Sequence, residues 1–504
     1  FQDMAYTDSK KREDSQRRDD METFYSVKDF GAAGDGKRLD TEAIQAAINR
    51  CSQEGGGDVL LEKGEFISGT LYMISACGAG DAPTLIVTAS AKLTASGSIG
   101  AYGTDTHYNR YVNEHDMDRC FIYAEEAENF GIMGEGIIDG NAESFPNEGS
   151  IYRPMMIRFL RCRDVKLKGI KLYQSAAWTT AFLDSENIWV EDLEICNDKR
   201  YNGDGLDFDG CRNVFVARCR ISGTDDNLCL QAGSREYPVE NVHISDCHFT
   251  SICAGIRIGL KSIGDIRNVT VSGCTFQNVW REGIKIECTE GGNISDICIQ
   301  GNIMHNVSRP VFILLNNRME EIGSSVELKE MPEIGTLRRV TISGLTARDD
   351  EEMEKIHYRF QDDVMGRPEF GGIRVDANKD HPIENMVFQN IDYTAIGGVR
   401  LDEIPEGYPE VPDYKAGDTA KYNKTGDKSD IGLDTGKMEA AVSENYYPDW
   451  SRTTHLDIRN VKNLILAQVI LSTVHEDERP KYLVEGCRCL KEEIYDLDGI
   501  GYEK

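Results

Sequence analysis

Three aspartates, Asp204 and the adjacent pair Asp225 and Asp226, carry the strongest indication of chemistry in this chain. Carboxylates held close together are what cleavage of a glycosidic bond requires: a protonated one donates a proton, and an ionised one activates water or attacks the sugar. The structural alternative is that Asp-Gly and Asp-Asp steps only form turns, as they often do. The choice depends on the elements that position the three side chains.

The chain around these aspartates repeats. Each unit has a polar opening residue, an alternating apolar and polar run, a cysteine or small residue, and another short strand. Units open at Asp164, Asn187, Asn213, Asn241 and Asn268, with weaker matches at Asp296, Arg339, Asn385 and Asn463. The first five lie 23, 26, 28 and 27 residues apart, with no helical pattern between them. This pattern predicts an all-β fold, a parallel β-helix whose coils stack, and not leucine-rich repeats or a β-propeller.

A helix is expected only near the start of the chain. Residues 41–50 have helical periodicity, with one apolar face made of Ala43, Ile44, Ala47 and Ile48. The strand Asp58–Leu61 follows. We expect a short N-terminal helix that caps the open end of the stack.

Charge limits the partners of this chain. Asp and Glu outnumber Lys and Arg by 86 to 56, a net charge of −30 that disfavours nucleic acid and anionic membranes. No apolar run is long enough for a transmembrane helix. Residues 1–24 are highly charged, and we expect them to be disordered. Phe1 and Gln2 ahead of Met4 resemble a tag remnant. Residues 25–504 are expected to form a single domain.

Fifteen cysteines give an indication of the compartment. Cys219, Cys247 and Cys274 each lie six residues after the opening asparagine of their unit, which predicts an interior ladder of small hydrophobic groups. Unpaired cysteines favour a reducing compartment, so a cytoplasmic location is expected. The alternative is a secreted or periplasmic protein from which a signal peptide has been removed.

The repeat predicts how the aspartates meet. Neighbouring coils lie about 4.8 Å apart, and Asp204 and Asp225 are separated by 21 residues, slightly less than one coil. Asp225 and Asp226 would face opposite sides of a strand, so a turn or bulge must bring both into one cleft. Gly205 and Gly223 permit such a backbone, and the close carboxylates raise one another's pKa.

Two further aspartates follow in DGLDFDG, Asp207 and Asp209. They predict a turn rather than a calcium site, because the complete twelve-residue calcium loop is missing. We expect no metal and no other cofactor.

Several motifs together resemble one family. DFGAAGDGKRLDTEAIQAAI, SAAWTTAFLDSENIWVEDLEI, YNGDG, TDDNLCLQAG and DWSRTTHLDIRNVKNLILAQVIL are similar, in this order, to segments of the polygalacturonases of glycoside hydrolase family 28. The resemblance covers residues 25–500. It implies a right-handed β-helix and inverting hydrolysis without metal, with Asp225 as general acid and Asp204 and Asp226 activating water. One coil rise is shorter than the usual carboxylate separation of inverting enzymes, so inversion is expected from the resemblance alone.

The chain departs from the family pattern at two places. Where the family has Gly-His-Gly, this sequence has Cys253-Ala254-Gly255, and where it has Arg-Ile-Lys, this sequence has Lys285-Ile286-Glu287. A glutamate at the position that would hold a uronate carboxylate disfavours plain homogalacturonan. The residues expected to contact substrate are Lys285, Glu287, Arg257, Asn202 and Tyr201.

The predicted function is hydrolysis of a pectin-derived or other plant-type oligosaccharide, with exo action favoured over endo action. Two alternatives stay open. A β-helix lyase or epimerase would give ultraviolet-absorbing or epimerised products, and a non-catalytic glycan-binding β-helix would bind without turnover. The sequence leaves the oligomeric state open.

Overall fold

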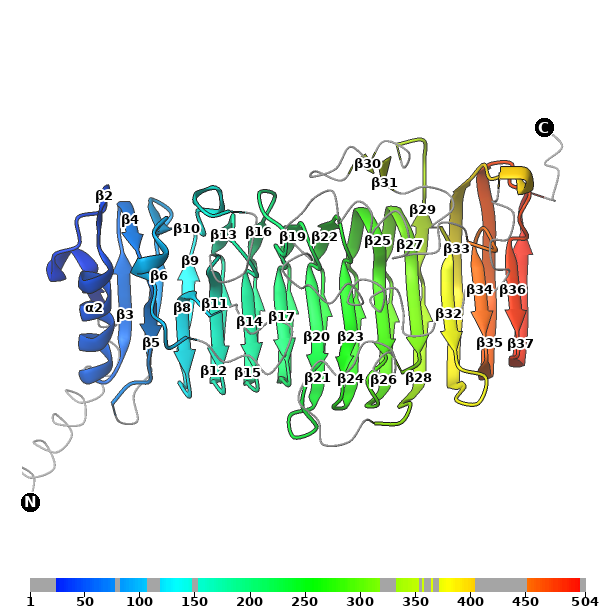
Figure 1. Cartoon of the computed structure of the whole chain (residues 1–504), viewed down its shortest axis with the longest axis horizontal. Coiled ribbons are helices and arrows are strands. Elements are labelled where there is room, and N and C mark those ends of the chain that lie inside the picture. Colours follow the sequence, from blue (N-terminus) through cyan, green and yellow to red (C-terminus); the bar gives the residue numbers. More distant parts are fainter. Residues whose placement is uncertain are drawn as a thin grey trace, which may run out of the picture.

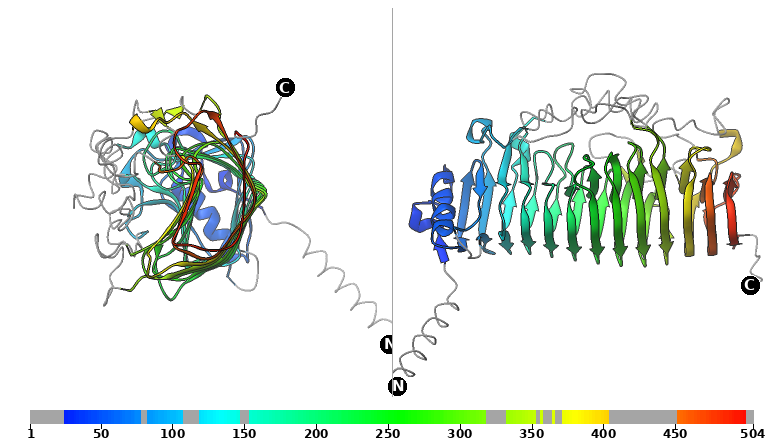
Figure 2. Two further views of the ribbon diagram at one scale, coloured as in Figure 1. Left: turned by 90° about the vertical axis from the view of Figure 1, so that its right-hand side faces the viewer. Right: turned by 90° about the horizontal axis from the view of Figure 1, so that it is seen from below.

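Short parallel strands stack coil upon coil along almost the whole chain, and form a right-handed parallel β-helix (Figure 1). The computed structural model describes residues 24–77, 82–106, 118–146, 153–317, 332–352, 356–357, 364–365, 371–403 and 451–498. Residues 1–23 of the predicted disordered extension lie outside these residues, and Phe24 lies within them. Figure 2, viewed along the stack, shows that successive coils superimpose around a shared interior. The predicted all-β class and parallel β-helix are confirmed.

Three ladders of parallel strands run along the stack, and the longest strands belong to two ladders. The first ladder contains β1 (Phe24–Ser26), β3 (Gly57–Leu61), β6 (Pro83–Val87), β9 (Gly131–Gly134), β12 (Arg163–Lys168), β15 (Glu186–Glu191), β18 (Arg212–Ala217), β21 (Val239–Ser245), β24 (Ile266–Ser272), β26 (Asn293–Gln300), β28 (Thr336–Ser343), β33 (Ile383–Gly397), β35 (Val461–His475) and β37 (Arg488–Asp496). The second contains β2 (Asp35–Leu39), β4 (Gly64–Ser68), β7 (Ala91–Ala95), β10 (Ile137–Asp139), β13 (Lys171–Tyr173), β16 (Glu194–Cys196), β19 (Arg220–Gly223), β22 (His248–Ser251), β25 (Thr275–Cys288), β27 (Ile303–Leu315) and β29 (Thr346–Arg348), and continues into β33 and β35. The third contains β5 (Leu71–Met73), β8 (Cys120–Glu125), β11 (Met155–Leu160), β14 (Thr180–Leu183), β17 (Leu206–Asp209), β20 (Leu228–Ala232) and β23 (Ile256–Ser262), continues through β25 and β27, and ends with β32 (Ile373–Ala377), β34 (Leu456–Arg459) and β36 (Tyr482–Glu485).

A few short elements lie outside the ladders. They are the antiparallel pair β30 (Ile356–His357) and β31 (Val364–Met365), and the 3-10 turns η1 (Val27–Phe30), η2 (Ile99–Ala101), η3 (Ala142–Ser144) and η7 (Leu401–Glu403). Among the described residues, no helix has the length and apolar character needed to cross a membrane.

The predicted capping helix is α2 (Thr41–Gln53), which lies at the end of the stack where the chain begins (Figure 1). Ile44, Ala47 and Ile48 are fully buried and belong to the interior cluster. They cover apolar side chains that the first coil would otherwise expose.

The polar residues that open the repeats have a shared conformation. All nine have a left-handed φ between 55° and 63°. Asparagine and aspartate tolerate this conformation better than other residues with a side chain, which explains why they open most units. Their amides also bond from coil to coil: Asn213 Nδ2 donates to Asn187 Oδ1 at 2.9 Å, and Asn241 Nδ2 donates to Asn213 Oδ1 at 3.0 Å. These residues therefore fix both the bend and the register of each coil.

The interior is a continuous column of apolar side chains. Cys219, Cys247 and Cys274 lie within it at successive coils, as the ladder prediction required. Phenylalanine rings stack in the same column, with Phe182 and Phe208 parallel at 5.1 Å between ring centroids. Each coil is therefore stabilised by burial against both neighbours.

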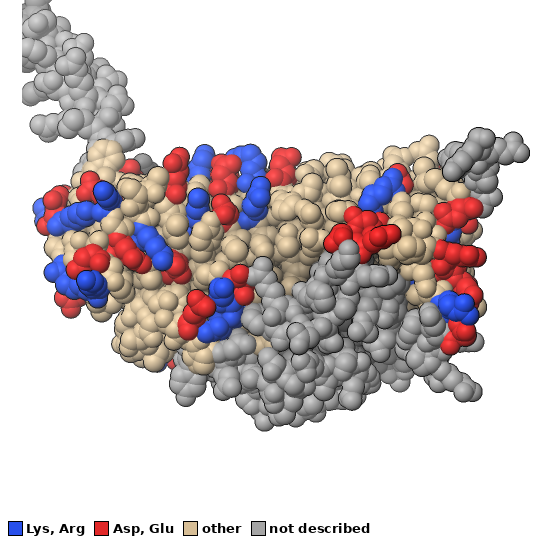
Figure 3. All heavy atoms as spheres, turned by 90° about the horizontal axis from the view of Figure 1, so that it is seen from above, with Lys and Arg blue, Asp and Glu red and all other residues tan. Residues whose placement is uncertain are grey.

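Charged side chains on the outer surface pair between coils. Figure 3 shows acidic and basic groups interspersed along one edge of the stack. Glu186, for example, lies between Arg163 (2.7 Å) and Arg212 (2.9 Å) of the two neighbouring coils. The net negative charge is therefore locally balanced along this edge.

Candidate active site

Asp204 and the Asp225–Asp226 pair meet on the outer side of the third ladder. β17 and β20 are neighbours, and Leu206 pairs with Leu228. Gly205 N donates to the Asp226 carbonyl at 3.0 Å. The coil is therefore 22 residues long, and Asp204 aligns with Asp226. The separation of 21 residues between Asp204 and Asp225 is therefore one residue less than a coil, in agreement with the expectation from the repeat.

Asp225 and Asp226 lie in the bend between β19 and β20, as predicted. The glycines around them are required because a side chain at their positions would not fit. A Cβ on Gly205 would lie 2.2 Å from the Asn227 carbonyl oxygen, and one on Gly223 would lie 2.6 Å from a backbone oxygen of the preceding coil. The two backbones can approach this closely only because no side chain separates them.

Asp226 is buried and held as a carboxylate. Its Oδ2 lies 2.6 Å from Arg257 Nη1, and its Oδ1 accepts a hydrogen bond from Ala254 N at 3.0 Å. Burial alone would raise the pKa of Asp226, but the positive charge of Arg257, a hydrogen bond from Cys253 and further cations together lower it. Asp226 is therefore ionised at neutral pH.

Asp225 has the opposite electrostatic environment. Burial, followed by the charge of Asp226, raises the pKa of Asp225. Its Oδ2 accepts a hydrogen bond from Asn202 Nδ2 at 3.4 Å, and its Oδ1 accepts one from Asp226 N at 3.0 Å. Asp225 remains partly exposed, whereas Asp226 and Asp204 are buried. The pair therefore combines a proton donor open to solvent with a buried carboxylate.

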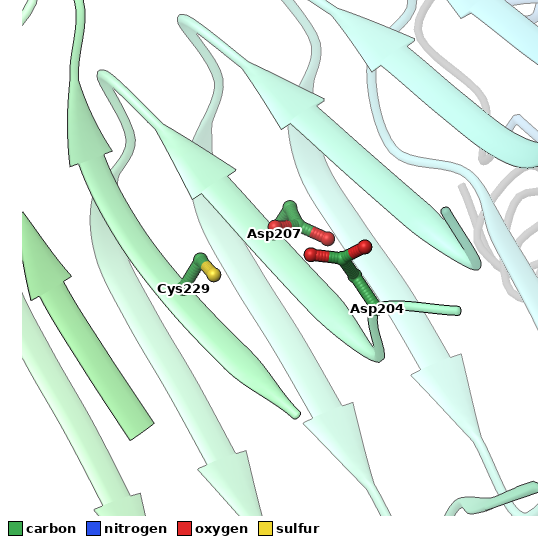
Figure 4. A group of neighbouring side chains, drawn as sticks. All are labelled: Asp204, Asp207 and Cys229. Atoms are coloured by element: carbon green, nitrogen blue, oxygen red, sulfur yellow. The ribbon is translucent and has the colours of Figure 1, made fainter. Parts of the chain in front are cut away.

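Asp204 and Asp207 form a second acidic pair beside the first, together with the thiol of Cys229 (Figure 4). Burial and the neighbouring carboxylates raise the pKa of both aspartates well above the ordinary value. The prediction that Asp207 and Asp209 form a turn was wrong, because both lie in β17. Leu206 and Phe208 face the interior, and the two aspartates alternate with them on the outer face.

Among the residues that the structure describes, two groups of side chains each bring three atoms of metal-binding type within 4.8 Å of one another. They are Asp204, Asp207 and Cys229, and Asp225, Asp226 and Cys253. A thiol binds a metal as thiolate. Burial raises the pKa of both cysteines well above the ordinary value. Without a metal ion, both thiols therefore keep their protons.

Arg153 holds the segment in front of Asp204. Its Nη1 donates to the Tyr201 carbonyl at 2.7 Å, and its Nη2 donates to Asn202 Oδ1 at 3.0 Å. Asn202 is thereby directed at Asp225, while the Tyr201 side chain is buried. Contact of either residue with substrate stays a prediction.

Arg257 and Lys285 lie side by side in register on β23 and β25, next to Cys229 of β20. Glu287 is 3.5 Å from both Arg257 Nε and Lys285 Nζ, and Lys285 also lies 3.8 Å from Glu282. All four side chains are largely buried. The glutamate therefore forms ion pairs with the cations of its own site.

A sequence model of the glycosyl hydrolases family 28 matches residues 51–331. The chain belongs to this family. The family 28 chain is thus a glycosidase. It is 24% identical to a probable polygalacturonase of Vitis vinifera over 84% of this chain and 87% of that protein.

Solved structures show the same fold. An exopolygalacturonase of Thermotoga maritima has a TM-score of 0.61 and 21% identity, covering 74% of this chain and 87% of that one. A family 28 exopolygalacturonase of Yersinia enterocolitica has a TM-score of 0.58 and 20% identity, covering 75% of this chain and 76% of that one.

The sequence predictions gave no site role to several side chains of the family 28 site, among them Asp207, Cys229, Cys253 and Arg281. Asp207 and Cys229 alternate with core residues in LDFD and LCL, and this period of two was a usable signal. The departure from Gly-His-Gly marked the position of Cys253 but not the contacts of its thiol, and Arg281 lies in the long strand β25, where no local pattern marks it.

Proposed function

We propose that this family 28 chain hydrolyses a glycosidic bond of a pectin-derived or other plant-type oligosaccharide with inversion at the anomeric carbon. Asp225 donates its proton to the glycosidic oxygen. Asp226, with Asp204 beside it, accepts a proton from the attacking water. The opposite pKa shifts of Asp225 and Asp226 carry this proposal, because adjacent carboxyl groups in unlike environments take the acid and base roles.

The assigned roles predict that activity is highest at an intermediate pH. Activity falls as the pH drops and Asp226 gains a proton, and it falls as the pH rises and Asp225 loses its proton. Because the two groups are coupled, the two limbs of the profile belong to the pair.

The substrate is proposed to differ from plain homogalacturonan at the subsite beside Glu287. A uronate carboxylate placed there would meet Glu287, and the neighbouring Arg257 and Lys285 are already paired with carboxylates of the protein. A neutral sugar instead offers hydroxyl groups, which can donate hydrogen bonds to the Glu287 carboxylate. We also propose exo action, and the lengths of the released products test it.

A substrate screen tests the proposal. Wild type and Asp225→Asn are incubated with homogalacturonan, rhamnogalacturonan and neutral plant oligosaccharides, and reducing ends, product anomer and ultraviolet absorbance are recorded. Asp192→Asn serves as the control, since Asp192 is exposed and lies outside the site. We expect hydrolysis with an inverted product in wild type and the control only.

Other outcomes of the screen contradict the proposal. Ultraviolet-absorbing products would show a lyase, a retained anomer would exclude inversion, and preferred cleavage of plain homogalacturonan would refute the role given to Glu287. Binding without turnover, unaffected by Asp225→Asn, would indicate a glycan-binding protein.

We also propose a reducing cellular compartment. All fifteen cysteines lie in the described residues, and none forms a disulfide. Cell fractionation with an antibody against the chain tests this location.

A further inference from the structure

Cys253 lies beside the acid–base pair, in the connection between β22 and β23. The residue is 6% exposed, and its thiol lowers the pKa of both Asp225 and Asp226. The sulfur and one oxygen of each carboxylate all lie within 4.8 Å of one another. One thiol therefore lies beside both of the carboxyl groups to which opposite roles are assigned.

Backbone contacts fix the position of this thiol. Cys253 N donates to Ser251 Oγ at 2.8 Å, and Ser251 Oγ donates to the Asp225 carbonyl at 2.6 Å. The next residue, Ala254, donates its N–H to Asp226. The segment 251–254 thus binds the Asp225–Asp226 dipeptide through two hydrogen bonds.

Arg281 fixes the direction of the thiol hydrogen bond. Arg281 Nη1 donates to the Cys253 sulfur at 3.2 Å, and Arg281 N donates to the Cys253 carbonyl at 3.2 Å. A guanidinium group only donates, so the sulfur accepts here and its own S–H is left to donate to a neighbouring carboxyl group. Burial raises the pKa of the thiol, which therefore keeps its proton.

We propose that Cys253 is a positioning residue for the catalytic pair, orienting both carboxyl groups and linking them to the charge of Arg281. The proposal rests on the roles assigned to Asp225 and Asp226 under the proposed function. Asp225 becomes a carboxylate as it gives up its proton, and the S–H donor then stabilises the charge that develops. Such an interaction is stronger in the transition state than in the ground state, so it raises kcat.

Other titratable groups surround the pair and contribute to the same pH profile. They come from four strands and their flanking residues, and they are Asp204, Asp207, Cys229, Arg257, Arg281 and Lys285. A single substitution at Cys253 leaves all of them in place, so its effect on the profile reports the thiol contact.

The test compares Cys253→Ala, Cys253→Ser and Cys247→Ala. Cys247 is an equally buried cysteine of the interior column and controls for the cavity that alanine leaves. We expect Cys253→Ala to lower kcat about 10-fold with KM unchanged. Both limbs of the pH profile move to higher pH, because the donor that favours the ionised carboxylates is lost. Cys253→Ser keeps a donor and recovers part of the rate, while Cys247→Ala retains wild-type kinetics.

A second measurement does not require turnover. The S–H stretching band of Cys253, isolated as the infrared difference between wild type and Cys253→Ala, shifts when the pH takes the carboxyl pair through its titration. If no oligosaccharide is hydrolysed, the proposed function fails, and a band that still moves with pH shows the contact without a catalytic role. A band that does not move, or Cys253→Ala kinetics equal to those of Cys247→Ala, overturns the proposal.

Discussion

Replacing Arg257 by methionine removes the charge that keeps Asp226 ionised. Arg257 Nη1 and Asp226 Oδ2 are 2.6 Å apart, and the two side chains are 11% and 1% exposed. Methionine retains an apolar stem of similar length. Breaking a buried ion pair by removing one partner costs about 3–5 kcal/mol, because the other charge is left buried without compensation.

An independent magnitude agrees with this cost. Unit charges 4 Å apart at an effective dielectric constant of 20 attract by about 4 kcal/mol. The entropy of unfolding, about 2.1 cal/mol/K per residue, amounts to about 1 kcal/mol/K for 504 residues. Arg257→Met is therefore expected to lower the Tm by about 3–5 °C where the coils unfold together.

The pH dependence has a defined sign. In the wild type the pKa of Asp226 is lowered, so the pair stabilises the fold above the ordinary pKa of an aspartate, and this contribution is lost as the pH falls through the folded pKa. In the variant, burial acts without Arg257 and raises that pKa. The loss of stability is then largest at neutral pH and shrinks in acid, where Asp226 gains a proton. The acid limb of activity moves to higher pH for the same reason.

Arg212→Met is the matched control. Arg212 Nη2 lies 2.9 Å from Glu186 Oε2, but these side chains are 46% and 24% exposed, so its loss should change stability by no more than about 0.5 kcal/mol. Differential scanning calorimetry and kcat/KM are measured from acid to neutral pH. Equal changes in Tm for both variants, or an acid limb that does not move in Arg257→Met, would refute the reasoning.

Three further predictions concern other parts of the molecule. Asp225→Asn should lower kcat by about 10²–10⁴-fold while the circular dichroism spectrum is retained, and a rate near that of wild type would remove Asp225 from the acid role. Burial raises the pKa of Asp349 to about 8, so its contribution to stability is complete below the ordinary pKa and lost as the pH rises through about 8. In urea unfolding, Asp349→Asn should therefore lose less stability between pH 4 and 8 than wild type does. Parallel curves of stability against pH for the two proteins would contradict this. Gly205→Ala should reduce both activity and Tm, because its Cβ would lie 2.2 Å from the Asn227 carbonyl oxygen, whereas Gly100→Ala, whose nearest neighbour lies at 3.8 Å, should behave as wild type.

Much of the fold follows from local rules. A polar residue that tolerates a left-handed φ opens each unit, as Asn213 and Asn241 do, and apolar residues then alternate toward the interior. The capping helix follows from the helical spacing of Ile44, Ala47 and Ile48. These signals are local in the chain, so the sequence alone is enough to detect them.

The site was only partly predictable. Asp204, Asp225 and Asp226 do meet, yet the turn expected at Asp207 is a strand, because the alternation of Leu206 and Phe208 toward the interior outweighs the turn tendency of Asp-Gly. The thiol of Cys253 escaped prediction, because its partners lie one coil away.

The sequence by itself determined the repeat, the class of fold and the residues able to transfer protons. The tertiary structure decided which of them face one another. Lateral register depends on the length of each connection and on the close glycine contacts between coils, so Asp204 aligns with Asp226 after 22 residues. The same register sets Arg257 against Asp226 and places the Cys253 sulfur within 4.8 Å of an oxygen of each carboxyl group. Burial then makes those distances decisive, because charges within a few ångströms in a poorly solvated site shift one another's pKa strongly.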